Sequence, residues 1–298
     1  MHKITCFGEV LWDVFPTHKK IGGAPLNVAL RLHSFKNDVS IISSIGDDKS
    51  GKELKKYIKK QGLSTVYIQK NNTYKTSEVA VKLDEKGAAT YKIKKPCAWD
   101  YIFLEEHLLS LVKSSDAFIF GSLISRNKQS EDTLKTLLNE AVFSVFDVNL
   151  RPPHYETEKL KALMKSASFI KFNDDELFEI NEKLGFINNS VKENIKHISK
   201  FTNTHQICVT RGGDGAILFY KQKFYQNNGY KITVADTVGA GDSFLATLID
   251  CLLKKENPQK AIDTECAVGA LVTKNHGANP KISLEEINKI IANSLLFF

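Results

Sequence analysis

The stretch ADTVGAGDSF, residues 235–244, places small residues and an acid where a helix is expected to begin. Gly239, Ala240 and Gly241 predict a tight turn, and the apolar periodicity after Asp242 predicts a helix. Unpaired N–H groups at a helix start attract anions, and small residues let a phosphate approach the backbone closely. The carboxylate of Asp242 can accept a proton from a substrate, or it can simply stabilise the helix start.

Two segments near the N-terminus carry side chains that suit a polyol. GEVLWD, residues 8–13, ends a predicted strand on Asp13, and GGAPLNVALRL, residues 22–32, begins a predicted helix. Gly22 and Gly23 permit unusual backbone angles, and Asn27 follows one turn later. A carboxylate and an amide can bind adjacent hydroxyls through paired hydrogen bonds, although both can equally be ordinary caps.

The tetrapeptide NDDE, residues 173–176, follows the predicted strand SFIKF. Asn173 and Glu176 have the spacing of a capping box, which is the interpretation that the local pattern favours. The alternative is an outer-shell contact to hydrated Mg²⁺, which needs few protein carboxylates.

A second glycine cluster, VTRGGDGAI at residues 209–217, lies between two predicted strands. A dinucleotide fingerprint or a P-loop has a helix after its glycines, so this cluster alone indicates a hairpin turn.

Strand patterns alternate with helical patterns along most of the chain, which predicts an α/β fold with a mostly parallel sheet. The predicted strands are residues 4–8, 39–45, 116–122, 143–149, 168–173 and 206–210, and the predicted helices include 26–35, 51–62, 131–141 and 174–185. Residues 77–93 instead predict a hairpin around Lys86 and Gly87, and the chain after Gly239 is mostly helical. We therefore expect one domain with a small β appendage.

The composition, with 298 residues, 42% hydrophobic and 25% charged, is typical of a globular protein. The net charge of +7 is mainly lysine, and the densest run, residues 52–60, has the spacing of a solvated amphipathic helix. We expect no nucleic-acid partner, no membrane segment and a cytoplasmic location. Five scattered cysteines without CxxC spacing indicate neither a disulfide framework nor a zinc site.

Six motifs in order, GEVLWD, GGAPLNVA, DVNLRP, NDDE, VTRGGDG and DTVGAGDSF, resemble the ribokinase-like, or PfkB, family of carbohydrate kinases. Within that family they resemble bacterial fructokinases, as does CAWDYI at residues 97–102. The resemblance implies an α/β, ribokinase-like three-layer sandwich with a mostly parallel central sheet. It implies a single kinase domain over residues 1–298, with β-lid segments at about 13–21 and 66–95.

The resemblance also implies a role for each motif. Asp13, Asn27 and Arg151 would bind the sugar, and Gly22 and Gly23 would form a hinge under the lid. The nucleotide would contact Asn173, Thr210, Gly212, Gly215, Asn275 and His276. Glu176 would organise Mg²⁺ through water. The backbone of Gly239, Ala240 and Gly241 would form the anion hole, and Asp242 would be the catalytic base. Asp236 would hold a monovalent cation with carbonyls near Val238, Val272, Asn275 and Gly277.

The implied activity is ATP-dependent phosphorylation of a primary hydroxyl of a small sugar, with fructose as the first choice. Ribokinase, 2-keto-3-deoxygluconate kinase, nucleoside kinase and a non-catalytic sugar or nucleotide sensor remain as alternatives. The implied cofactors are ATP and Mg²⁺, with K⁺ as a further candidate. The resemblance leaves open whether the protein forms a homodimer through the lid.

Overall fold

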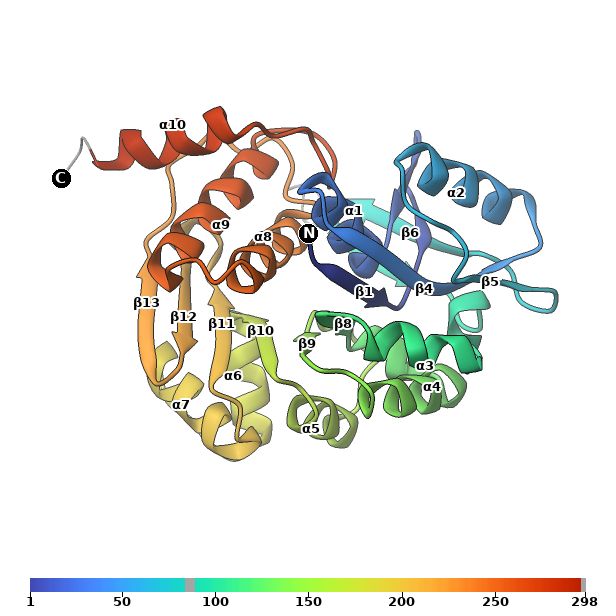
Figure 1. Cartoon of the computed structure of the whole chain (residues 1–298), viewed down its shortest axis with the longest axis horizontal. Coiled ribbons are helices and arrows are strands. Elements are labelled where there is room, and N and C mark those ends of the chain that lie inside the picture. The colour runs from blue at the N-terminus through green and yellow to red at the C-terminus, as the bar shows by residue number, and fades with distance from the viewer. Residues whose placement is uncertain (84–88, 296–298) are drawn as a thin grey trace. The chain divides into compact units, whose positions relative to one another are not determined.

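The computed structural model describes residues 1–83 and 89–295, which belong to two compact units, Met1–Val142 and Phe143–Phe298 (Figure 1). No helix within the described ranges is both long and apolar enough to span a membrane.

The N-terminal unit contains four parallel strands in the order β8-β1-β4-β5. Their aromatic and branched side chains are buried, as expected for parallel strands that are covered on both faces. The predicted strands at residues 4–8, 39–45 and 116–122 are confirmed. The strand bounds are Lys3–Phe7 (β1), Asp38–Gly46 (β4), Ile68–Asn71 (β5) and Ala117–Gly121 (β8).

A second, four-stranded sheet in the N-terminal unit has the order β3-β2-β6-β7. Its strands are Leu11–Val14 (β2), Lys19–Gly22 (β3), Ser77–Leu83 (β6) and Ala89–Ile93 (β7). Strands β6 and β7 pair in antiparallel fashion, which confirms the predicted hairpin, whereas its predicted turn at Lys86 and Gly87 lies outside the described residues. Both sequence segments that were assigned to a lid contribute strands to this sheet, and the lid role itself stays a prediction.

The helices of this unit are Ala24–Ser34 (α1), Lys49–Lys60 (α2), Glu106–Lys113 (α3) and Lys128–Leu138 (α4). Helix α1 packs against β1, β4 and β8. In α2, Leu54 and Ile58 are buried while Lys52, Lys56 and Lys59 are exposed, which confirms the amphipathic helix predicted from the lysine run.

The C-terminal unit has five strands in the order β13-β12-β11-β10-β9, of which β9, β10 and β11 are parallel. Helices α6 and α7 pack against β10 and β11, and α9 packs against β12 and β13 (Figure 1). The strands are Ser144–Asp147 (β9), Phe169–Asn173 (β10), Gln206–Thr210 (β11), Ala216–Tyr220 (β12) and Lys223–Asn227 (β13). The helices are Thr157–Lys165 (α5), Asp174–Lys183 (α6), Val191–Thr202 (α7), Ala240–Leu253 (α8), Pro258–Thr273 (α9) and Leu284–Leu295 (α10).

The CAWDYI segment holds a buried ion pair in the N-terminal unit. Arg126 donates from Nε to Asp100 Oδ1 at 2.6 Å and from Nη2 to Asp100 Oδ2 at 2.9 Å. The two side chains are 2% and 0% exposed, and the guanidinium lies 4.0 Å from the ring centre of Trp99. Because neither charge contacts bulk water, each depends on the other for its stability in the core.

We predict that Asp100→Asn lowers the free energy of unfolding by about 3–5 kcal/mol, because it leaves the Arg126 guanidinium buried without its counter-charge. Urea unfolding measures the change. The matched control is Asp132→Asn, which breaks the exposed pair with Lys128 and should cost under about 1 kcal/mol. Equal stability losses in the two variants would contradict the prediction.

Candidate active site

The first turn of α8 follows a glycine whose backbone conformation and close neighbours disfavour any side chain. Gly239 is the N-cap of α8 and has φ 75°, a left-handed conformation that favours glycine. A Cβ at Gly239 would lie 2.3 Å from the Cβ of Ala278. Ser243 Oγ donates to the carbonyl of Ala278 at 3.2 Å, so the segment around Ala278 is bound to this turn.

Asp242 is the third residue of α8, whose N-cap residue, a glycine, has no side chain with which to cap the helix. Asp242 is therefore not the N-cap residue, and its two interpretations, as a proton acceptor and as a group that stabilises the helix start, both stay predictions. Its carboxylate still lies in the first turn, where the helix dipole favours negative charge.

A buried lysine lies beside this turn. Lys171 on β10 and Asp147 on β9 are register partners, and Lys171 Nζ donates to Asp147 Oδ1 at 2.9 Å. The two side chains are 7% and 6% exposed. A Cβ at Gly241 would be 3.5 Å from Lys171 Nζ, which places the ammonium next to the start of α8.

Electrostatics keeps this lysine charged. Burial by itself lowers the pKa of Lys171, but attraction by Asp147, Glu176 and Asp242 outweighs it, so the net pKa is raised. One ammonium thus lies among three carboxylates at the start of α8.

Asn173 and Glu176 form the predicted capping box at the start of α6. Glu176 N donates to Asn173 Oδ1, and Asn173 N donates to Glu176 Oε2, both at 2.8 Å. Leu150 N donates to Glu176 Oε1, also at 2.8 Å. Burial raises the pKa of Glu176, and the charge of Lys171 opposes this shift.

Both oxygens of Glu176 accept a backbone N–H, which leaves each with one further lone pair. This arrangement fits a contact to metal-bound water better than direct ligation of a metal ion. Within the described residues, no group of three or more His, Cys, Asp or Glu side chains is placed to hold a metal ion.

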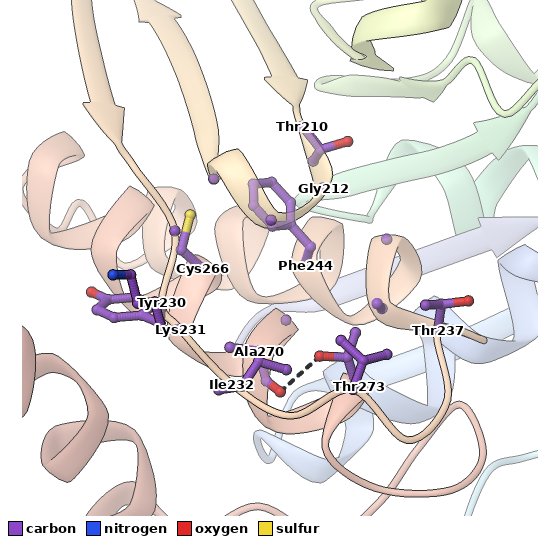
Figure 2. A pocket seen from close by; sticks show the side chains of 17 residues that line it. Thr210, Gly212, Tyr230, Lys231, Ile232, Thr237, Phe244, Cys266, Ala270 and Thr273 are labelled. Carbon is purple, nitrogen blue, oxygen red and sulfur yellow. Dashed lines mark hydrogen bonds between the residues drawn. The ribbon is translucent and has the colours of Figure 1, made fainter.

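A cavity of about 520 Å³ opens at the same place in the C-terminal unit (Figure 2). The β11–β12 turn and the start of α8 line one part of it, with Thr210, Gly212, Gly215, Ala240 and Gly241. Another part is mainly apolar and includes Tyr230, Ile232, Val234, Cys266 and Ala270. The turn is a short 3₁₀ helix, Gly212–Asp214, between antiparallel strands, so the predicted hairpin is confirmed.

Three residues assigned to the nucleotide do not line this cavity: Asn173, Asn275 and His276. Asn275 and His276 are exposed beyond the end of α9, where Asn275 Nδ2 donates to Leu271 O at 2.8 Å. Their roles stay predictions.

Asp236 holds a loop closed. Its carboxylate accepts the N–H of Val238 and that of Gly277, each at 3.0 Å, so it joins the segment before α8 to the segment after α9. The carbonyl of Val272 accepts Asn275 N at 3.0 Å. The monovalent cation assigned to this loop stays a prediction.

In the N-terminal unit, the glycine pair lies close to Asp13 and Asn27. A Cβ at Gly22 would lie 2.2 Å from Asp13 Oδ2, so glycine at this position leaves room for the carboxylate. Gly23 is the N-cap of α1 at φ 109°, and its carbonyl accepts the N–H of Asn27 at 2.9 Å. The Asn27 residue is 6% exposed.

Arg151 lies in the C-terminal unit just after β9, where Nη1 donates to the carbonyl of Leu150 at 2.9 Å. Its contact with a sugar stays a prediction.

Sequence reasoning missed Lys171 and Asp147 as site residues. The available signal was a charged residue within each of two otherwise apolar strands, FIKFN and SVFD. A charge in a buried parallel strand needs a partner, so each one indicates the other.

Comparison with known proteins gives a family and a fold. A model of the pfkB family carbohydrate kinases matches residues 2–285. A fructokinase from Vibrio alginolyticus is 26% identical over 299 residues, which cover 93% of this chain and 95% of that protein.

Two solved structures are similar over the whole chain. A fructokinase with bound ATP from Xylella fastidiosa is 20% identical, with a TM-score of 0.85, and the match covers 98% of this chain and 99% of that one. A fructokinase double mutant from Vibrio cholerae, in a fructose, ADP and potassium ion bound form, is 23% identical, with a TM-score of 0.83 and 98% coverage of both chains.

The likeness to these structures confirms the predicted ribokinase-like α/β fold. Because the family match extends over nearly the whole chain, the protein belongs to the pfkB family of carbohydrate kinases.

Proposed function

We propose that the protein is an ATP-dependent fructokinase, which transfers the γ-phosphoryl group of ATP to a primary hydroxyl of fructose. The observation that carries the proposal is the meeting of a glycine-lined cavity, the N-terminus of α8, Asp242 and Lys171 in one place. The relatives named above as fructokinases, one with ATP and one with fructose and ADP, support this choice of donor and acceptor.

The donor phosphates lie at the glycine turn and at the start of α8. The first N–H groups of a helix have no partner within the helix, so they can bind phosphate oxygens. Ala240 N donates to Thr237 O at 3.3 Å, a long hydrogen bond that a phosphate oxygen can replace. The Lys171 ammonium adds positive charge where the transferred group becomes more negative.

Asp242 acts as the base. Its carboxylate accepts the proton of the sugar hydroxyl as the O–P bond forms and the bond to the leaving ADP breaks. Glu176 would hold Mg²⁺ through water, and the ion would supply charge neutralisation at the phosphates. K⁺ at the Asp236 loop is a further candidate, because potassium is bound in the Vibrio cholerae fructokinase.

The sugar is bound by Asp13, Asn27 and Arg151 and is covered by the small β-sheet acting as a lid, which excludes water from the reaction. The protein works in the cytoplasm with small-molecule partners, and its lid sheet is the surface for a homodimer. The same family includes enzymes for other acceptors, so ribose, 2-keto-3-deoxygluconate and nucleosides are the competing substrates. A non-catalytic sensor is disfavoured because Asp242 and the glycines around it are present.

The proposed acceptor is tested by ADP release with a panel of sugars and nucleosides at saturating MgATP. We expect the highest kcat/KM with fructose. A higher value with ribose, 2-keto-3-deoxygluconate or a nucleoside contradicts the fructokinase assignment. The assignment as a kinase would still hold. No ADP release with any acceptor supports the sensor.

We predict that Asp242→Asn lowers kcat by roughly 10²-fold or more, because the amide cannot accept the proton. The thermal midpoint should change little, since asparagine has nearly the size of aspartate and Asp242 is not the N-cap residue of α8. The matched control is Asp175→Asn, the same change in the first turn of α6 at an exposed position. A folded Asp242→Asn protein with normal turnover would overturn the base assignment.

We predict that Lys171→Met lowers kcat by roughly 10²-fold, because the transferred phosphoryl group loses a charged donor. The single variant also leaves Asp147 buried without its ion-pair partner, which should reduce stability. The double variant Asp147→Asn/Lys171→Met removes both charges, so it should regain stability but not turnover.

The control for this experiment is Lys183→Met, which breaks a more exposed pair with Glu179 in the same unit. The Lys183→Met protein should phosphorylate the sugar with a normal kcat. If the double variant recovers normal kcat, Lys171 has only a structural role.

A further inference from the structure

A second cavity, of about 520 Å³, lies in the N-terminal unit. The start of α2, the loop between β5 and β6, the first residues of β6 and the segment that leaves β7 line it. Its volume is in the range of small-molecule sites. None of the residues that we propose to bind sugar, nucleotide or phosphate lines this cavity, so the proposed reaction leaves it without a role.

Strand register separates this cavity from the proposed sugar site. In the parallel pairing of β2 with β6, Trp12 is opposite Glu78 and Asp13 is opposite Val79. Side chains alternate between the two faces of a sheet, so Trp12 and Glu78 share the face that is turned away from Asp13. Trp12 Nε1 donates to Ser50 O, and Ser50 Oγ donates to Glu78 Oε1, both at 3.0 Å. The first turn of α2 therefore lies against this same face.

The N-cap residue of α2, Asp48, is already bound within the fold. Its Oδ1 accepts from Gly51 N at 2.7 Å and from Thr76 Oγ1 at 2.8 Å, and its Oδ2 accepts from Thr76 N at 2.8 Å. Burial by itself raises the pKa of Asp48, but these hydrogen bonds outweigh burial and the net pKa is lowered. The next two residues, Lys49 and Ser50, line the cavity and have no partner within the helix for their N–H groups.

The charges of the cavity favour an anion. Lys75, just before β6, and Lys94, just after β7, line it, and neither makes a salt bridge within the described ranges. The third lysine, Lys49, lies 4.0 Å from Glu53. Besides Asp48, Glu78 is the one carboxylate that lines the cavity.

A buried hydroxyl at the end of the small sheet also lacks a strong partner. Ser77 and Cys97 line the cavity where β6 begins and the chain leaves β7. Ser77 is 1% exposed, and its Oγ has no nitrogen or oxygen partner in the part of the chain that the structure describes. Its neighbour is the Cys97 thiol, a weak partner whose pKa burial raises to about 12, so that the thiol is neutral. A ligand oxygen at this point would relieve the cost of burying the hydroxyl unpaired.

These groups together match a phosphate on a hydroxylated molecule. A phosphate monoester has a charge near −2 at neutral pH and three strong acceptor oxygens, which suit the ammonium groups of Lys75 and Lys94 and the N–H groups of α2. One oxygen of Glu78 is bound to Ser50, and the carboxylate can accept further hydroxyl groups. We infer that this cavity binds the phosphate group of a small hydroxylated metabolite, as a sugar phosphate or as free phosphate, between α2 and β6.

The test uses two probes, inorganic phosphate and glucose 6-phosphate, with calorimetry on the full chain in the absence of nucleotide. We expect Lys75→Met/Lys94→Met to weaken binding of both probes by about tenfold or more, because charged hydrogen bonds are lost. Both lysines are exposed, so the variant should keep the thermal midpoint of the wild type. The matched control, Lys56→Met/Lys59→Met, removes the same charge from exposed positions of α2 that do not line the cavity. It should bind both probes as the wild type does.

Glu78→Gln separates the two sources of phosphate. If the ligand is a sugar phosphate, the wild type binds glucose 6-phosphate more tightly than inorganic phosphate, and Glu78→Gln weakens the former without weakening the latter. Equal binding of the two probes identifies free phosphate as the ligand.

Three outcomes overturn the inference: no binding of either probe by the wild type, unchanged binding by Lys75→Met/Lys94→Met, and an equal loss in the Lys56→Met/Lys59→Met control. Lys171→Met reports on the other place where phosphate is expected. It should keep the binding that Lys75→Met/Lys94→Met loses. Failure of the proposed function has a different signature, because a protein that releases no ADP with any sugar would still show these dissociation constants.

Discussion

The buried ammonium of Lys171 is the constraint on which the proposed chemistry of the C-terminal unit depends. A charge with 7% exposure is stable only beside opposite charge, and Asp147, its register partner on the neighbouring strand, supplies it. The pairing is possible only when β9 and β10 are parallel and in this register. The same ammonium attracts Glu176 in the first turn of α6 and Asp242 in the first turn of α8. One lysine therefore interacts electrostatically with carboxylates from three different elements, β9, α6 and α8.

Close backbone packing complements this charge. Gly239 against Ala278, Gly215 against Asn227 and Gly229 against Gly213 leave no space for a Cβ on the glycine. Phosphate sites need N–H groups held in fixed positions, and these contacts reduce the freedom of the loops that present them. The glycines are thus required for rigid packing as much as for backbone conformation.

The N-terminal unit contains the polar side chains that we propose bind the sugar. Gly22 makes room for the carboxylate of Asp13, and Gly23 begins the helix that carries Asn27. The buried pair of Arg126 and Asp100 stabilises the CAWDYI segment after the small sheet. Each unit thus contains a buried charge pair, Asp100 with Arg126 in the N-terminal unit and Asp147 with Lys171 in the C-terminal unit. Only the pair in the C-terminal unit lies next to the proposed reaction centre.

The sequence by itself determined the α/β class, most of the strands, the hairpin at residues 77–93 and the family, because these follow from local periodicity and from motifs continuous in the chain. The outer strands β5 and β13 were not predicted, since IQKN and KFYQN are short and largely polar, without the apolar pattern of the inner strands. Local patterns also did not locate the first residue of the helix after residue 238, and the tertiary structure assigns its N-cap to Gly239 and places Asp242 in its first turn. Likewise, only the fold joins Lys171 to Asp147, 24 residues apart in sequence, and Asn227 to Asp263, 36 residues apart. Such pairs depend on strand register and helix packing, which are set by long-range contacts that no short stretch of sequence contains.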